Sequence, residues 1–267
     1  MTVFENKIKH EITREKFEAI RDHKYSRDND TFFGYTYGNV SSWLTWNRDE
    51  NGGIVKGNIP EDYSIELKEA IKKSVRSRHI WDGPIDNWDQ DKPPAFCPKL
   101  TTDIVFLGLN MAGNGRPILP GPSFQNARGH RRIVETFFGT EAEGAYFTDI
   151  IKPDKRILGN VEKKSNSGQL MQYIDKHRIV LRDHIRLFIK ELDFIGAKKP
   201  LLIVFGGDAE WILNEGTDFN FRKERFYKIV KIWHYAYRYI KGEDERERDE
   251  KYKDDTRTKL KPYITIP

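Results

Sequence analysis

The most chemically informative segment of the chain is a glycine-rich loop that follows a short apolar stretch. Residues 103–109 read DIVFLGL, and Asn110 comes next, at the start of a loop that reads NMAGNGRPILPGPSFQNARGHRR. Glycine allows a backbone amide to approach a ligand closely, and the Asn110 side chain offers both a hydrogen-bond acceptor and a donor. The same pattern is also typical of a tight turn capped by an asparagine, so the spacing alone leaves both interpretations open.

Two further polar side chains are associated with apolar stretches of the same kind. Asp149 lies within YFTDII at 146–151, and His234 follows FYKIVKIW at 226–233. A histidine can act as an acid, a base or a hydrogen-bond donor near neutral pH, and a carboxylate can accept N–H groups. The structural alternatives are a half-buried histidine among neighbouring aromatic residues for His234, and a helix cap or ion-pair partner for Asp149.

The apolar stretches that position these residues are spaced like the strands of a parallel sheet. Another stretch, LLIVF at 201–205, follows a predicted helix at 169–194 whose apolar residues recur every three or four positions. Alternation of strands and helices is typical of βαβ units, in which helices cover both faces of the sheet. We therefore predict an α/β fold, with a three-layer α/β/α core around a central, mostly parallel four-stranded sheet. Asn110, Asp149 and His234 fall near the carboxyl ends of the strands, where such sheets bind ligands.

The remaining sequence divides the chain into three parts. Residues 1–99 form an N-terminal extension that we expect to pack on the core, and residues 100–240 form the core itself. Residues 241–267 form a charged C-terminal segment. The stretch from Lys241 to Lys259 contains seven basic and eight acidic residues and almost no apolar ones, which is typical of a solvated helix or a flexible loop.

Within the N-terminal extension, residues 13–23 and 62–78 carry helix-forming residues and are predicted to be surface helices. The aromatic stretch at 32–46 is interrupted by Gly and Asn and is compatible with a strand, a loop or a lid. Residues 82–99 are dense in Pro and Asp and are predicted to connect the extension to the core.

The composition indicates an ordinary globular protein with a modest preference for anions. The chain has 267 residues, with 46 Lys plus Arg, 41 Asp plus Glu and a net charge of +5. Residues 125–240 contain 21 basic and 15 acidic residues, which favours a partner such as DNA. Cys97 is the single cysteine, so an intrachain disulfide is excluded and no cysteine-rich zinc motif is present. Without a signal peptide or an apolar run of about 18 residues, we expect a cytoplasmic protein outside the membrane.

Five segments have the order and spacing of motifs from one enzyme superfamily. The first is Gly108-Leu109-Asn110, and the second is Phe124, fourteen residues after Asn110. The other three follow or end the later apolar stretches, and they read FTDIIKP at 147–153, IVFGGDA at 203–209 and WHYA at 233–236. Together they resemble the uracil-DNA glycosylase superfamily, and in motif style they are closest to its mismatch-specific and single-strand-selective branches.

The resemblance is carried by the corresponding family motifs. Those branches carry Gly-(Ile, Leu or Met)-Asn-Pro-Gly after an apolar strand, and an aromatic residue that stacks on the flipped base stands where this chain has Phe124. A Thr-Asn-x-Val-Lys strand end and a His-Pro-Ser loop correspond to the segments around Asp149 and His234. Ordinary packing under a loop is the structural alternative for Phe124.

The resemblance implies an enzyme that hydrolyses the N-glycosidic bond of a flipped, damaged or modified base, uracil included. Asn110 would position the attacking water, and His234 would hydrogen-bond the departing base as negative charge develops. The implied substrate-binding residues are Gly108, Leu109, Met111, Phe124 and Asp149. The implied phosphate contacts, for which a solvated helix face is the alternative, are Arg128, His130, Arg131 and Arg132. We expect a monomer that acts on single- or double-stranded DNA without a metal or another cofactor.

The chain departs from the family pattern at three places. Met111-Ala112 replaces Pro-Gly after Asn110, Tyr235-Ala236 replaces Pro-Ser after His234, and Asp149 stands where Asn is usual. An Asn can donate to a uracil carbonyl and accept its N–H, whereas an ionised carboxylate only accepts and favours an amino-bearing edge such as that of cytosine or a modified cytosine. A protonated Asp149 would restore the donor.

Two other functions fit the same residues. The altered motif positions are compatible with a non-catalytic protein that retains the glycosylase fold and binds nucleic acid or a nucleotide. An N-glycosidase that acts on free nucleosides or nucleotides would need a closed pocket without a phosphate-binding track, and the basic cluster at 128–132 argues against it.

Overall fold

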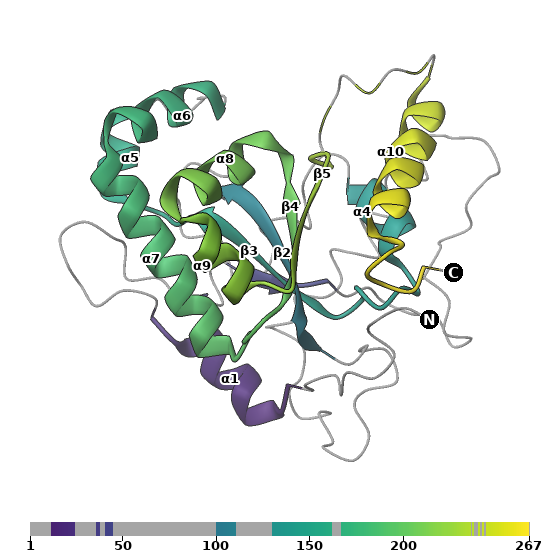
Figure 1. The fold of residues 1–267 in the computed structure, drawn as a ribbon, viewed down its shortest axis with the longest axis horizontal. Coiled ribbons are helices and arrows are strands. Elements are labelled where there is room, and N and C mark those ends of the chain that lie inside the picture. Colours follow the sequence, from purple (N-terminus) through teal and green to yellow (C-terminus); the bar gives the residue numbers. More distant parts are fainter. Residues whose placement is uncertain are drawn as a thin grey trace.

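The computed structural model describes most of the predicted core and parts of the N-terminal extension (Figure 1). The described residues are 12–24, 36–37, 41–44, 100–110, 130–161, 167–235, 237, 240, 242 and 244–266. The helix predicted at 62–78 and the connection predicted at 82–99 lie outside these residues.

A five-stranded sheet lies at the centre of the molecule, in the order β1-β3-β2-β4-β5. Its strands are β1 (Ser41–Trp43), β2 (Thr101–Asn110), β3 (Ala145–Ile151), β4 (Leu201–Phe205) and β5 (Lys228–Ile232). β2 pairs in parallel with β3 and β4, and β4 pairs in parallel with β5. The predicted parallel sheet of four strands is confirmed. The aromatic stretch of the extension adds β1, which pairs with β3 in antiparallel orientation at the edge of the sheet.

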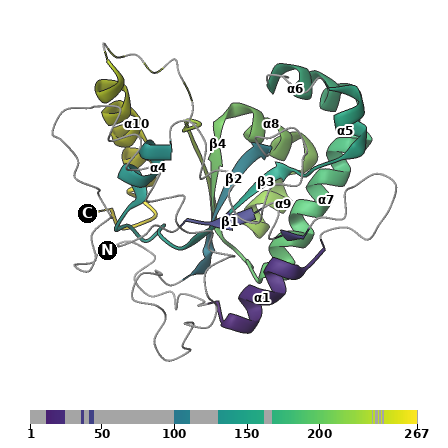
Figure 2. The ribbon, with the colours of Figure 1, turned by 180° about the vertical axis from the view of Figure 1, so that it is seen from behind.

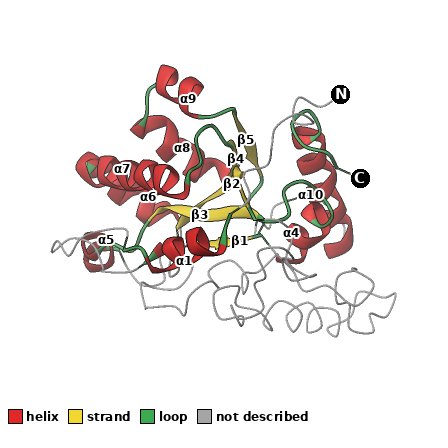
Figure 3. Ribbon diagram, turned by 90° about the horizontal axis from the view of Figure 1, so that it is seen from below, coloured by secondary structure: helices red, strands yellow, loops and turns green. Residues whose placement is uncertain are grey.

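Helices cover both faces of the sheet, as the views in Figures 1, 2 and 3 show. The face that we call the α7 face is covered by α1 (Arg14–Asp22), α5 (Lys155–Asn160), α6 (Ser167–Lys176), α7 (Arg178–Ile195), α8 (Gly206–Gly216) and α9 (Phe219–Arg225). The opposite face, the α4 face, is covered by α4 (His130–Phe137) and α10 (Glu245–Leu260). The result is the predicted three-layer α/β/α architecture.

Strand β2 contributes to the hydrophobic cores on both faces because successive side chains of a strand point to opposite sides. Val105, Leu107 and Leu109 belong to the core on the α7 face. Ile104 and Phe106 belong to the core on the α4 face. Burial on both sides explains why the stretch is continuously apolar instead of alternating with polar residues.

The single helix predicted at 169–194 is wrong, because the structure has two helices there, α6 and α7. His177 lies between them with φ −118° and ψ 67°, which is outside the helical region. Its N–H still donates to the carbonyl of Tyr173 at 3.0 Å, and the N–H of Val180 donates to the carbonyl of His177 at 2.8 Å. These bonds close the backbone on both sides of His177, and the apolar spacing continues across the break between the two helices.

The C-terminal segment forms a helix with one buried side, so the flexible-loop alternative is wrong for residues 245–260. Its buried residues, Asp249, Tyr252, Thr256 and Leu260, recur at three- or four-residue spacing. They face α4 and β5, against which α10 packs. Because two of these four residues are polar, the buried stripe of α10 has little apolar signal in the sequence.

A buried polar cluster joins β3 to α7. The ammonium of Lys152, which follows β3, lies 2.6 Å from a carboxylate oxygen of Glu191, and both side chains have zero exposure. The other oxygen of Glu191 accepts hydrogen bonds from the hydroxyl groups of Tyr146 at 2.9 Å and Thr148 at 2.8 Å. The ammonium also donates to Thr148 Oγ1 at 2.5 Å. Each charge in this cluster is therefore compensated within the protein.

We predict that Glu191→Gln destabilises the protein by about 3–5 kcal/mol, because it leaves the ammonium of Lys152 buried without a counter-charge. The double variant Lys152→Met/Glu191→Gln should recover most of this loss. Urea unfolding monitored by circular dichroism measures both. Asp175→Asn, which removes an exposed partner of Arg178, is the control and should change stability by less than about 1 kcal/mol. An equal effect of Glu191→Gln and the control would contradict the prediction.

Candidate functional site

Four positions singled out in the sequence, Gly108, Asn110, Asp149 and His234, lie at the carboxyl edge of the sheet. In the register of β2 and β3, Gly108 is opposite Asp149 and Asn110 is opposite Ile151. In the register of β4 and β5, Phe205 is opposite Ile232, so His234 leaves the sheet beside the start of α8. After β2 the chain crosses to β3 on one side, and after β4 it crosses to β5 on the other side. Ligands of open parallel sheets bind where the direction of crossing reverses in this way.

Gly108 makes room for the carboxyl group of Asp149. A Cβ atom at position 108 would lie 2.1 Å from Asp149 Oδ1 and 3.3 Å from its carboxyl carbon. The side chain of Asp149 therefore lies across the backbone of β2. Even-numbered residues of β2 such as Ile104 and Phe106 face the α4 side, so the Asp149 carboxyl lies on that side as well.

The carboxyl of Asp149 is buried and lacks a polar partner among the described residues. Only 5% of this residue is exposed. Its surroundings raise its pKa to about 7, chiefly because burial disfavours the charged form. Lys152 lowers the pKa by its positive charge and Glu191 raises it, but neither effect outweighs burial. Among the described residues, Asp149 neither caps a helix nor forms an ion pair, which are the two structural roles that the sequence left open.

His234 lies on the same side of this edge, among aromatic rings. Its ring stacks on Tyr235 at a centroid distance of 4.3 Å and meets the edge of Phe205 at 6.2 Å. Gly206 has φ +82°, a conformation that favours glycine, and a Cβ atom there would lie 3.6 Å from the Cβ of His234. Burial lowers the pKa of His234, and the carboxylate of Asp208 only partly offsets it. The imidazole is therefore neutral at pH 7 and retains one N–H to donate.

Tyr235 connects the two titratable groups. The negative charge of Asp149 raises the pKa of the buried Tyr235 phenol, in addition to the larger effect of burial. The ring of Tyr235 in turn stacks on His234. Asp149, Tyr235 and His234 thus form one cluster on the α4 side of the carboxyl edge, beside Gly108.

The other predicted site residues are placed differently. Leu109 is 9% exposed, and its side chain packs into the core on the α7 face, away from Asp149. Asn110 is the last residue of β2, but the placement of its side chain lies outside what the structure describes. The same is true of the side chains of His130 and Arg131 in α4, and of all atoms of Met111, Phe124 and Arg128.

Arg132, predicted to contact a DNA phosphate, points into the protein. Its residue is 9% exposed, and its Nε lies 2.5 Å from Asp249 Oδ1 of α10. Its Nη1 donates to the carbonyl oxygens of Tyr235 at 3.0 Å and Tyr237 at 2.7 Å. A phosphate contact by Arg132 would require breaking this buried ion pair.

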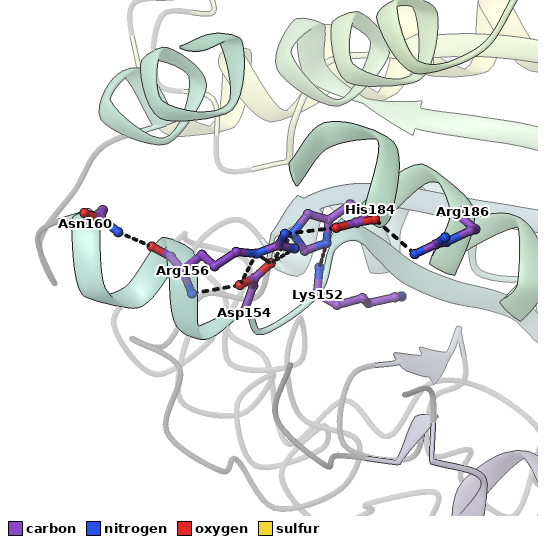
Figure 4. A network of polar contacts seen from close by, with 7 residues as sticks. Lys152, Asp154, Arg156, Asn160, His184 and Arg186 are labelled. Carbon is purple, nitrogen blue, oxygen red and sulfur yellow. Dashed lines mark hydrogen bonds and ion pairs between the residues drawn. The ribbon is translucent and has the colours of Figure 1, made fainter. Parts of the chain in front are cut away.

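A second polar network lies beyond the end of β3 (Figure 4). Asp154 caps α5 by accepting the N–H of Arg156, and its carboxylate lies 3.3 Å from Nε2 of His184. Nδ1 of His184 accepts the N–H of Lys152 at 3.2 Å, so the proton of the neutral ring is on Nε2. Burial alone would raise the pKa of Asp154, but the hydrogen bonds from His184 and Arg156 together lower it. Both ring nitrogens of His184 have protein partners, which indicates a structural role.

Sequence reasoning gave Gly206, Tyr235 and Asp249 no role in the cluster around His234, and it predicted a phosphate contact for Arg132 in place of an internal one. Two glycines directly after a buried strand were a usable signal for Gly206. The partnership of Arg132 with Asp249 spans 117 positions of the chain. Nothing in a single sequence connects residues so far apart.

We predict that Asp149→Asn stabilises the protein, and that the gain grows as pH rises. The pKa of Asp149 is about 7 in the folded protein and near 3.8 in the unfolded chain. Below pH 3.8 the carboxyl is protonated in both states and burial costs no charge. As pH rises from 3.8 to about 7, only the unfolded chain ionises freely, so the folded wild type loses stability relative to Asp149→Asn. The full difference corresponds to about 4 kcal/mol. Urea unfolding of both proteins from pH 4 to pH 8 measures it. A difference in stability that does not change with pH would contradict the burial of an uncompensated carboxyl.

Comparisons with known proteins add no further assignment. No family model, no curated protein and no solved structure matches this chain. Within the described ranges, no three His, Cys, Asp or Glu side chains gather as a metal-binding group. No helix among the described residues has both the length and the apolar character needed to span a membrane.

Proposed function

We propose that this chain hydrolyses the N-glycosidic bond of a nucleobase in DNA, as do members of the uracil-DNA glycosylase superfamily that it resembles. The observation that carries the proposal is the buried Asp149 carboxyl, which has no polar partner among the described residues and lies at the same edge as His234. Leaving a buried polar group unpaired costs about 1–3 kcal/mol or more. A ligand that brings its own N–H and C=O groups to Asp149 would supply hydrogen bonds that no described residue provides.

The proposed reaction adds water to the sugar carbon as the bond to the base nitrogen breaks. The sugar gains positive charge in the transition state, and the base leaves with the electron pair of the broken bond. His234, as a neutral imidazole, would donate its N–H to an oxygen of the departing base and stabilise the anion. Asn110, at the end of β2, would orient the water through its side-chain carbonyl. The added water releases one proton to solvent and becomes the sugar hydroxyl, and the base anion takes one proton from solvent, so that one water is consumed.

Asp149 would select the base by its hydrogen-bonding edge. With a pKa of about 7, the carboxyl is protonated in slightly acidic solution and then offers one donor and one acceptor, as an asparagine does. This form matches the adjacent C=O and N–H of uracil or hypoxanthine. The ionised form at higher pH only accepts, and it matches an amino-bearing edge.

DNA binding would rely on the basic residues just before α4 and at its start. Arg128, His130 and Arg131 remain proposed phosphate contacts, because they lie at the end of the glycine-rich segment. Arg132 is not included, since its guanidinium is paired inside the protein. Whether the preferred substrate is single- or double-stranded is decided by assaying both.

The first test is base release from oligonucleotides that carry uracil, hypoxanthine, xanthine or modified cytosines, followed by alkaline cleavage at abasic sites. We expect release of at least one base, and a loss of about 100-fold or more in Asn110→Ala with DNA binding retained. Undiminished release by Asn110→Ala would remove this residue from the mechanism. Binding of DNA without release of any base would favour the non-catalytic alternative.

The second test is the pH dependence of release. We expect release of uracil or hypoxanthine to fall above pH 7, by up to about tenfold per pH unit, as Asp149 ionises. Asp149→Asn should remove this decline, because an amide keeps its donor at every pH. Asp254→Asn, a change at an exposed position of α10, is the matched control and should follow the wild-type profile. Identical profiles for wild type and Asp149→Asn would exclude Asp149 from base recognition.

A further inference from the structure

The turn that carries His234 is held from outside by one guanidinium group. The turn is closed by its own backbone, because the N–H of Tyr237 donates to the carbonyl of His234 at 2.8 Å. Two other carbonyls of this segment, those of Tyr235 and Tyr237, both accept from Nη1 of Arg132. Arg132 belongs to α4, which enters the fold directly after the glycine-rich loop.

The guanidinium is itself fixed by α10. Asp249 Oδ1 accepts from Nε of Arg132, and the side chain of Asp249 is 3% exposed. The ring of Tyr252, one helical turn further along α10, lies 5.8 Å from the guanidinium carbon. A planar, always-charged group with several N–H donors suits such a junction better than the single ammonium of a lysine. Removing either partner would leave the other charge buried, which gives the pair a strong tendency to stay formed.

The sequence of this turn does not fix its backbone. Proline would fix the backbone angle φ, but residues 234–237 read HYAY and contain no proline. The two carbonyls that Arg132 binds, those of Tyr235 and Tyr237, are therefore held by a contact from outside the turn.

We infer that Arg132 and Asp249 are positioning residues for His234, and that the C-terminal helix α10 is thereby part of the site. Arg132 joins the segment after β2 to the turn after β5, and Asp249 holds it in place from α10. The orientation of His234 toward a departing base depends on both residues, although neither touches the reacting atoms. This inference rests on the proposed function for its catalytic meaning, but its structural content is measurable without any substrate.

The variants that test the inference keep most of the local volume. Arg132→Lys retains the positive charge but loses the planar set of donors, and Asp249→Asn removes the counter-charge. Glu250→Gln is the matched control, because it changes the neighbouring residue of α10, whose partner Lys253 is in an exposed i,i+3 pair at 3.3 Å. Thermal unfolding by circular dichroism identifies which variants fold, and one folded variant of the two is enough for the measurement.

The first readout is the imidazole signal of each histidine in ¹⁵N–¹H NMR spectra recorded against pH, with His234→Gln used for assignment. We expect Arg132→Lys and Asp249→Asn to shift the His234 signals and to raise its pKa toward the ordinary value, because a loosened turn admits water. His184, buried on the α7 face, should keep its wild-type signals. Unchanged His234 signals in the folded variants would overturn the inference, and so would equal changes at His184.

The second readout is base release by wild type and variants, on the substrate identified in the release assay. We expect kcat to fall on the order of 10- to 100-fold with KM nearly unchanged, since misplacement of a catalytic group acts on the transition state. Glu250→Gln should release base at the wild-type rate. A kcat at the wild-type level in variants with shifted His234 signals would overturn the catalytic part. A wild-type protein that releases no base would contradict the proposed function but leave the NMR result to decide the positioning.

Discussion

Strand β2 is hydrogen-bonded to β3 on one edge and to β4 on the other, and its side chains enter the cores on both faces. This double constraint leaves it no freedom to shift, because a slip of one residue would exchange the two cores. The register of Gly108 and Asn110 relative to β3 and β4 is therefore fixed by the burial of the apolar side chains along β2. The positions of the polar residues at the carboxyl edge therefore depend on the packing of the apolar residues of β2 in the two cores.

Both faces of the sheet contain paired buried charges, and Asp149 differs from them. On the α7 face, Lys152 and Glu191 neutralise each other, and Asp154, His184 and Arg156 form a connected network. On the α4 face, Arg132 and Asp249 form a pair, but Asp149 has no such compensation from a described residue. Buried charges in proteins are normally paired or neutralised, so the raised pKa of Asp149 is the expected result when no described residue compensates its charge.

The parallel sheet could be predicted from the sequence, because its strands are continuously apolar. The apolar stretch at 201–205 coincides with β4. It also placed Asp149 and His234 at one edge, since strand ends in a parallel sheet coincide. The bend at His177 was not predictable, because helical periodicity continues through it. The packing of α10 and the direction of Arg132 were missed for a related reason: both depend on a polar contact across 117 positions. The pKa of Asp149 depends on burial, which only the folded chain defines.

Gly108 and Asp149 occupy one shared volume, since the carboxyl stands where a side chain at 108 would begin. In a homologous protein with this arrangement, a residue larger than glycine at position 108 would require a smaller or displaced side chain at position 149. Two positions 41 residues apart would then vary as a correlated pair. A single substitution at 149 is therefore open only to side chains that fit across the backbone of a glycine at 108.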